Sequence, residues 1–160
     1  MQFIPWRYIA SWRCVGCGKC CSYDVVLHFQ EWLAIVKNYG VELTVSDLNR
    51  FYLRRKSDGS CSFLYNYSGV PICGLQHMKP IACKIWPFRI LSSPKYGYAD
   101  DAAYKYRENR TFIYADSNCD GLAYGLPTQE FTNYTLREFV EIAMGLRSAQ
   151  YKTTRHIRLL

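Results

Sequence analysis

Four of the eight cysteines in this 160-residue chain lie within eight consecutive positions, in the sequence CVGCGKCC. Cys14, Cys17 and Cys20 are each separated by two residues, and Cys21 follows Cys20 directly. Two intervening residues let a tight loop turn successive sulfur atoms toward one point, and the two glycines supply the backbone freedom that such a loop needs. The run therefore predicts a loop that ligates a metal ion or an inorganic cluster.

The spacing also bears on which metal is bound. In iron–sulfur proteins, closely spaced thiolates ligate several corners of a cubane and a remote cysteine completes the set. Structural zinc sites more often use two separated Cys-x-x-Cys pairs. Here one dense run precedes four single cysteines, which are Cys61, Cys73, Cys83 and Cys119. The pattern favours a four-iron four-sulfur cluster, with zinc as the alternative, and His77 could complete a Cys₃His zinc site.

The adjacent Cys20 and Cys21 complicate a single site. Neighbouring side chains tend to point apart, so we expect these two thiols to serve different centres, or one of them to be spare. Eight thiols divide into two sets of four, although one or two of them, with Cys119 or Cys61 as the first candidates, could be buried as small hydrophobic residues. The number of centres stays open at this stage.

A disulfide scaffold and a redox dithiol account less well for the cysteines. A disulfide scaffold requires an oxidising compartment or the cytosol of a hyperthermophile. The sequence shows neither a signal-peptide core nor an apolar run of roughly 20 residues that could span a membrane. A redox dithiol at Cys14 and Cys17 would lack its usual βαβ setting. We therefore expect a cytoplasmic protein, without a membrane partner, whose thiols ligate metal and whose metal-free form is unfolded or molten.

The composition predicts a folded chain. Apolar residues make up 49% of the chain and aromatic residues 16%, which is enough for a hydrophobic core. The length suits one domain, and no repeat or linker interrupts it. We predict a single α+β domain over residues 1–160, with its motif core at 12–125, a C-terminal helix at 135–150 and a basic tail at 151–160.

Local patterns predict several helices and short antiparallel strands organised around the metal site. A helix should begin near Phe29 and end at Gly40, and a second should run from an N-cap at Ser46 to about Arg55. Residues 61–75 read as a hairpin, 80–87 as a short helical turn between two prolines, and 88–92 and 111–115 as strands. For the C-terminal helix, Thr135 and Glu138 have capping-box spacing.

The cysteine motifs also carry a resemblance. The segments CVGCGKCC, CSFL, ICGLQHMKPIACKIWPF and NCDGLAYG resemble, in content and order, the YkgJ-type cysteine-cluster family, which has a zinc- or iron-chelating CxxCxxCC domain. The match runs from about residue 12 to residue 125. The resemblance implies that all eight cysteines are metal ligands, namely Cys14, Cys17, Cys20, Cys21, Cys61, Cys73, Cys83 and Cys119.

A more distant similarity, to the flagellin lysine N-methylases, implies cluster-dependent methylation of protein lysines. The chain lacks a glycine-rich nucleotide loop after a strand, so this activity is kept only as an alternative. No residue is assigned a catalytic role, and no oligomeric state is predicted.

The basic charge leaves one further alternative. The net charge of +7 counts every cysteine as a neutral thiol, so bound thiolates would lower it. Arginines stand beside tyrosines in RFYLRRK, residues 50–56, and in the tail. Such pairs are typical of nucleic-acid surfaces, and also of ordinary solvated helix faces. A zinc module that contacts nucleic acid or an acidic protein is the alternative that follows.

Overall fold

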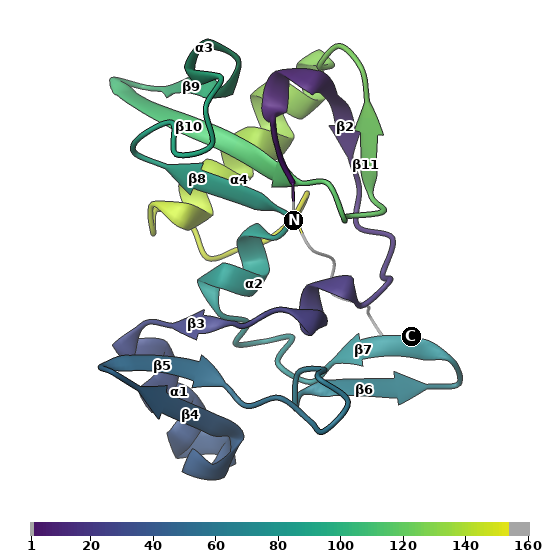
Figure 1. Cartoon of the computed structure of the whole chain (residues 1–160), viewed down its shortest axis with the longest axis vertical. Helices are drawn as coiled ribbons and strands as arrows, with labels where there is room; N and C mark the ends of the chain where they lie inside the picture. Colours follow the sequence, from purple (N-terminus) through teal and green to yellow (C-terminus); the bar gives the residue numbers. More distant parts are fainter. Residues whose placement is uncertain (1, 154–160) are drawn as a thin grey trace. The chain divides into compact units, whose positions relative to one another are not determined.

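The structure is a computed structural model that describes residues 2–153, in two compact units. Unit 1 comprises residues 2–15 and 84–153, and unit 2 comprises residues 16–83. Helices and antiparallel strands are mixed in both (Figure 1), which confirms the α+β prediction. The single-domain prediction stays a prediction, and residues 154–160 of the predicted tail lie outside the described residues.

Unit 1 is built on a four-stranded antiparallel sheet. Its longest strand, β10, pairs with the other three over successive parts of its length. The strands are β1 (Phe3–Pro5), β8 (Phe88–Leu91), β9 (Ala103–Tyr106) and β10 (Asn109–Asp116). The predicted strands at 88–92 and 111–115 are therefore confirmed.

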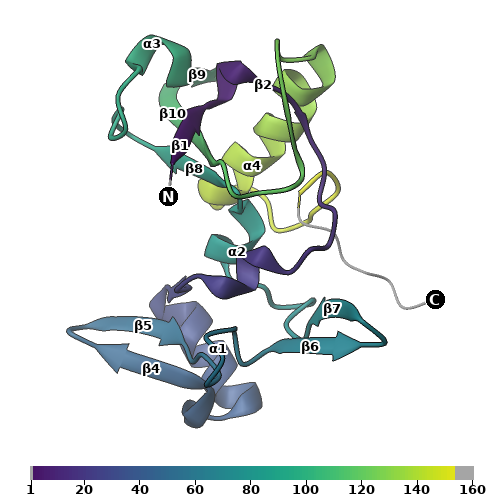
Figure 2. The same cartoon turned by 45° about the vertical axis from the view of Figure 1, so that its right-hand side comes forward.

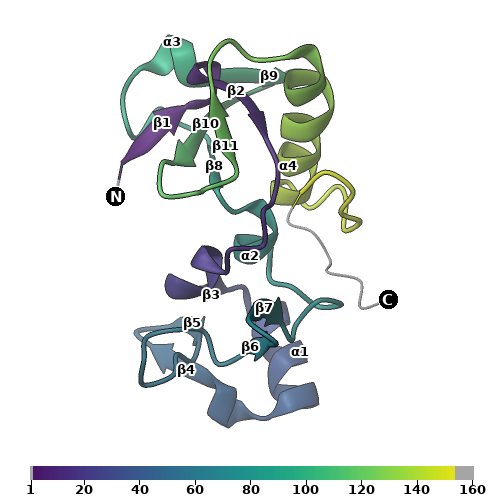
Figure 3. The same cartoon turned by 90° about the vertical axis from the view of Figure 1, so that its right-hand side faces the viewer.

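Helix α4 (Leu136–Ala143) covers one face of this sheet (Figures 1 and 3). Phe139 and Val140 are fully buried there, and Phe139 packs edge-on against Phe88 of β8 with ring centroids 4.7 Å apart. The opposite face carries a smaller cluster in which α3 (Ala99–Ala102) packs on Phe112 and Tyr114. Burial of aromatic side chains on both faces supplies the main stabilising term of unit 1.

The C-terminal helix differs from its prediction in both length and capping. It ends at Ala143 rather than near 150, and a π-helical turn, Phe131–Thr135, precedes it. Thr135 has helical backbone angles and makes no side-chain cap. The capping-box prediction is wrong because the Glu138 carboxylate instead accepts hydrogen bonds from the backbone N–H groups of residues 151–153.

A separate two-stranded sheet in unit 1 pairs β2 (Ile9–Trp12) with β11 (Leu122–Tyr124). A 3₁₀ turn, η1 (Trp6–Tyr8), leads into β2. Gly121 precedes β11, and a Cβ atom there would collide with the carbonyl oxygen of Arg13. The Arg13 N–H donates to the Gly121 carbonyl at 3.0 Å, so only glycine lets the two segments approach this closely.

Unit 2 begins with the 3₁₀ turn η2 (Lys19–Ser22) and contains one long helix, α1 (Phe29–Tyr39). The helix starts at the predicted residue. Gly40 ends it with φ of 101°, in the region that favours glycine. At the N-terminus, the Glu31 carboxylate accepts a hydrogen bond from the His28 N–H at 2.9 Å. The first predicted helix is confirmed.

The second predicted helix is wrong, because its residues form a hairpin. Strands β4 (Thr44–Asp47) and β5 (Arg50–Leu53) pair directly, and β3 (Val26–Leu27) joins the other side of β5. Leu48 and Asn49, the two residues between the strands, both have positive φ, as a type I′ turn requires. A valine in β4 and aromatic residues in β5 favour strand over helix, and this outweighs the apparent N-cap at Ser46.

The hairpin predicted at residues 61–75 and the helical turn predicted at residues 80–87 are both present. Strands β6 (Leu64–Tyr67) and β7 (Val70–Cys73) form the predicted hairpin around a Ser68-Gly69 turn (Figure 2). Helix α2 (Ile81–Ile85) begins just after Pro80 and ends before Pro87. After α1, the short 3₁₀ turn η3 (Val41–Leu43) leads into β4. No helix within residues 2–153 has the length and apolar character needed to cross a membrane.

Candidate metal centre

Five cysteines of unit 2 line one small cavity of about 40 Å³. They come from three separate parts of the chain: the η2 turn, the two ends of the β6–β7 hairpin, and α2. They are Cys20, Cys21, Cys61, Cys73 and Cys83. The fold of unit 2 thus gathers thiols that lie more than sixty positions apart in sequence.

The backbone of the first loop fixes Cys20 and Cys21. Gly18 begins the η2 turn in a left-handed conformation, with φ of 75°, and its carbonyl accepts a hydrogen bond from the Cys21 N–H at 3.0 Å. A Cβ atom at Gly18 would lie 3.0 Å from the Pro71 side chain, so glycine allows the loop to pack against β7. This turn places both neighbouring thiols at one cavity. Whether they serve different centres, or one of them is spare, stays a prediction.

Backbone hydrogen bonds bring the other three cysteines to the same place. The Cys61 N–H donates to the Cys21 carbonyl at 2.8 Å, which joins the hairpin directly to the first loop. Cys73 is the last residue of β7 and pairs with Leu64 at the start of β6. Cys83 lies in the first turn of α2, where its N–H donates to the Pro80 carbonyl.

Helix α1 holds the start of α2 through one carboxylate. Glu31 accepts a hydrogen bond from the Ile81 N–H at 2.7 Å with one oxygen, while its other oxygen accepts the His28 N–H. Negative charge at a helix N-terminus is stabilising, because the first N–H groups lack partners within the helix. Glu31 therefore helps to position Cys83, two residues after Ile81.

A hydrogen bond connects the two adjacent thiols. The Cys21 thiol donates a hydrogen bond to Cys20, and this bond lowers the pKa of Cys20 to about 7 although burial opposes the change. The positive charge of Lys79 acts in the same direction. The same bond raises the pKa of Cys21, and burial adds to that rise. One of the pair is therefore readily available as a thiolate, the form that binds metal.

The other three thiols are held in the neutral form by their surroundings. Burial raises the pKa of Cys61 and of Cys73, and it raises the pKa of Cys83 well above its usual value. Each thiolate would also be repelled by the others, because like charges close together disfavour ionisation. A bound cation reverses this balance, since it stabilises every thiolate at once.

The rest of the cavity wall is apolar apart from one cation. Val25, Leu53, Leu75 and Pro80 complete the lining together with Lys79. Lys79 is the residue that sequence reasoning missed, although its position directly before the predicted Pro80 turn was a signal that could have indicated it. An apolar wall excludes water, and this strengthens electrostatic interactions within the cavity.

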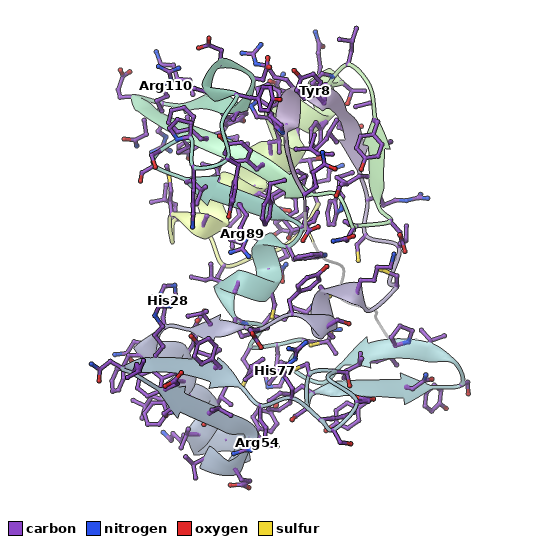
Figure 4. The ribbon with its side chains drawn as sticks, viewed as in Figure 1. Tyr8, His28, Arg54, His77, Arg89 and Arg110 are labelled. Carbon is purple, nitrogen blue, oxygen red and sulfur yellow. The ribbon has the colours of Figure 1, made fainter. Side chains whose placement is uncertain are left out.

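Neither described histidine belongs to this lining. The His77 ring nitrogen Nε2 lies 3.4 Å from the Tyr39 hydroxyl, and His77 is exposed. His28 caps α1, and Figure 4 shows it well apart from His77. The structure therefore gives no support to a Cys₃His set. An all-thiolate donor set suits zinc, copper(I) or an iron–sulfur cluster, and does not suit magnesium or calcium.

The five thiols are gathered but not yet arranged as ligands. Within residues 2–153, no three histidine, cysteine or acidic side chains form a group that could hold a metal ion in its present geometry. The cysteines are thiols rather than disulfides. Metal binding would therefore require the sulfur atoms to rearrange as they lose their protons, so the structure defines a candidate centre by its donors and not by its geometry.

Three predicted ligands do not line this cavity. Cys17 is exposed in unit 2. Cys14 and Cys119 belong to unit 1, where Cys14 packs against the main core and Cys119 is buried within it. The Trp12 indole N–H donates to the Cys119 sulfur at 3.3 Å. Cys119 is thus surrounded by hydrophobic residues, as expected of a cysteine that is buried as a small hydrophobic residue. Its role as a metal ligand stays a prediction.

Two of the three arginines of RFYLRRK, Arg54 and Arg55, make contacts within unit 2. Arg54, labelled in Figure 4, donates to the Glu42 carbonyl at 2.6 Å, and Arg55 donates to Gly59 and forms an ion pair with Asp24. These contacts use the guanidinium groups of Arg54 and Arg55 to connect loops within unit 2. The segment is a strand with a loop after it, so the predicted helix face does not exist.

Comparison with known proteins identifies a family. A model of the CxxCxxCC family, described as a "putative zinc- or iron-chelating domain", matches residues 13–120, which is more than half of the chain and includes all eight cysteines. The chain belongs to this family. The predicted resemblance is therefore confirmed, and so is a zinc- or iron-chelating cysteine domain as its coarse description. No curated protein and no solved structure matches the chain.

Proposed function

We propose that unit 2 of this CxxCxxCC-family protein is a thiolate metal-binding module whose centre forms in the cavity lined by five cysteines. The observation that supports it is the convergence of those five thiols, from three parts of the chain, on one cavity whose remaining lining is mostly apolar. Chance burial would spread cysteines singly through a core, because each behaves there as a small hydrophobic residue. Thiolates this close together would repel one another, so ionisation of several of them at once requires a cation.

Two identities of the centre compete, and each has its own support. The cavity volume of about 40 Å³ favours a single ion, because roughly 10–15 Å³ on this measure already holds one water molecule. A zinc or iron ion with four thiolates needs little more room than that. The Cys-x-x-Cys-x-x-Cys spacing is typical of cubane ligation, although only Cys20 of its three cysteines lines this cavity. A cubane here would need more room, for four iron and four sulfide atoms, and ligands from the other cavity thiols.

Anaerobic purification with elemental analysis tests the proposal directly. A colourless protein with one equivalent of zinc would identify the single-ion centre. A brown protein with about four irons and four sulfides per chain would identify the cubane. A protein that holds neither metal, and takes up neither during reconstitution under reducing conditions, would contradict the proposed function.

Single Cys→Ser variants of the five cavity residues locate the ligands, because serine has similar size and ligates zinc and iron poorly. A four-ligand centre predicts that four variants lose metal and that one, at the spare position, retains it. Cys17→Ser is the matched control, since Cys17 belongs to the same loop but is exposed and does not line the cavity. Metal content equal to that of the wild-type protein in all five variants would reject this cavity as the site.

A further inference from the structure

The lining of the cavity with five cysteines includes one basic side chain, that of Lys79. Lys79 is the only charged side chain other than the thiols among the described residues that line it. Lys79 is half-buried and forms no ion pair with a carboxylate within the described residues. A lysine on a protein surface is normally solvated, so a lysine at the wall of a small apolar cavity calls for an electrostatic reason.

The backbone on both sides of Lys79 fixes its place. On the N-terminal side, a turn is closed by a hydrogen bond from the Met78 N–H to the Leu75 carbonyl at 3.0 Å. On the C-terminal side, Pro80 is buried and Ile81 is bonded to Glu31. Lys79 is therefore held between two of the cavity cysteines in sequence, Cys73 and Cys83, on a segment that is tied down at each end.

Lys79 lines the cavity together with several of the thiols and not beside one alone. Cys20, Cys73 and Cys83 line the same cavity of about 40 Å³, so a charge on Lys79 acts on a centre built from any of them. These three residues come from the first loop, the hairpin and α2 respectively. Lys79 thus lines the cavity on which all three segments converge.

Any four-thiolate centre in this cavity carries a net negative charge. A zinc ion with four thiolates has a formal charge of about −2, and so does a cubane in its oxidised resting form with four thiolate ligands. A buried group of that charge is unfavourable unless an opposite charge or hydrogen-bond donors compensate it. The need for compensation is therefore the same for both candidate metals.

We propose that Lys79 is the charge-compensating residue of the thiolate centre, which raises the affinity of unit 2 for its metal without ligating it. The inference rests on the proposed function. An ammonium group has no lone pair for a metal, so its contribution is electrostatic. Because the cavity wall is apolar, that contribution is larger than for a surface lysine and less sensitive to salt.

The test measures the affinity for Zn²⁺ by competition with a chelator of known affinity, in the full chain under reducing conditions. Lys79→Met removes the charge but keeps the length of the side chain, and Lys79→Gln removes the charge but keeps a polar end. We expect both variants to bind Zn²⁺ about tenfold more weakly, as loss of one partly buried charge predicts, while Lys79→Arg stays within about threefold of the wild-type protein. The deficit should persist when the salt concentration is raised.

The control is Lys37→Met, in which an exposed lysine of the last turn of α1 loses its charge at the surface of the same unit. This change lowers the net charge by the same amount as Lys79→Met. Because Lys37 does not line the cavity, it should leave the affinity for Zn²⁺ unchanged. If the purified protein holds a cluster instead of zinc, the readout is its midpoint potential. Lys79→Met should then make the potential more negative, because reduction adds negative charge that the lysine no longer offsets.

The outcomes separate the two proposals. Wild-type protein that binds metal, with Lys79→Met and Lys79→Gln equal to it, would overturn the role of Lys79 and leave the proposed function intact. An equal loss in Lys79→Arg would also overturn it, because the requirement would then be for shape and not for charge. Wild-type protein that binds no metal would remove the proposed function and the inference together.

Discussion

Unit 1 and unit 2 are similar in size but differ in what holds them together. The main core of unit 1 contains 13 buried residues, mostly large and aromatic, between a four-stranded sheet and α4. The core of unit 2 contains seven buried residues, one of which is Cys61, and three more of the cavity cysteines pack against it. Unit 1 can therefore be stabilised by apolar burial, whereas part of the interior of unit 2 consists of thiols.

The difference has an energetic consequence. Folded units shorter than about 70–80 residues rarely gain enough from a single hydrophobic core, and many natural ones add a structural metal. Unit 2 falls below that length with residues 16–83. A metal bound by the cavity thiols would add its binding free energy to the stability of unit 2. The comparison therefore predicts one metal-dependent unit and one metal-independent unit.

Metal removal should give the largest effect. We expect chelation under reducing conditions to unfold unit 2 and to leave unit 1 folded, because structural zinc contributes about 10 kcal/mol or more of apparent binding free energy. Hydrogen exchange measured by mass spectrometry reads the two units separately. Residues 16–83 should lose protection, while the Asn109–Asp116 strand keeps it. Cooperative loss of protection in both units would instead support the single-domain prediction.

A core substitution in unit 1 should destabilise unit 1 and leave metal binding by unit 2 unchanged. Phe139→Ala removes a fully buried ring that packs on Trp12 and Phe88, and we expect it to lower the free energy of unfolding of unit 1 by about 3–5 kcal/mol. Metal content per folded chain should not change. Phe29→Ala, at a ring that is 54% exposed, is the control and should cost far less. Loss of metal in Phe139→Ala would contradict the independence of the two units.

A smaller effect is expected at the buried carboxylate of α4. Glu138 accepts hydrogen bonds from the backbone of Tyr151, Lys152 and Thr153. We expect Glu138→Gln to destabilise unit 1 by about 2 kcal/mol, because hydrogen bonds to a charged group are stronger than neutral ones. Faster amide exchange at residues 151–153 would report the local loss. Glu130→Gln, at an exposed partner of Lys152, should change stability by less than about 1 kcal/mol.

The smallest expected effect is a pH dependence of unit 1. Burial tends to raise the pKa of Glu141, but hydrogen bonds and charges from Arg137 and Arg147 outweigh it and lower that pKa overall. A carboxyl whose pKa is lower when folded stabilises the protein above its unfolded pKa, and that stability is lost as pH falls through the folded value. We expect acid below about pH 4.3, the ordinary value for Glu, to destabilise unit 1. In urea titrations, Glu141→Gln should flatten this slope.

Much of the local structure follows from sequence pattern. The start of α1 at Phe29, its end at Gly40 and the turn before α2 all depend on residues whose effect is confined to a few positions. The failures share a cause. Ser46 and Thr135 both look like helix caps, but strand pairing with Phe51 in one case and the preceding π-helical turn in the other determine the conformation. Tertiary contacts outweigh a preference worth about 1 kcal/mol.

The candidate site shows the same division. That the chain is a cysteine-rich chelating domain follows from its residues alone, because the number and spacing of thiols are properties of the covalent chain. The three-dimensional fold was needed to establish that Cys20 and Cys21 share one cavity, that Cys119 is in a hydrophobic core with Trp12, and that Lys79 lies among the thiols. The spacing of cysteines along the chain determines only which thiols can approach one another within one loop. Burial and the pairing of distant strands determine which thiols come together in the folded protein.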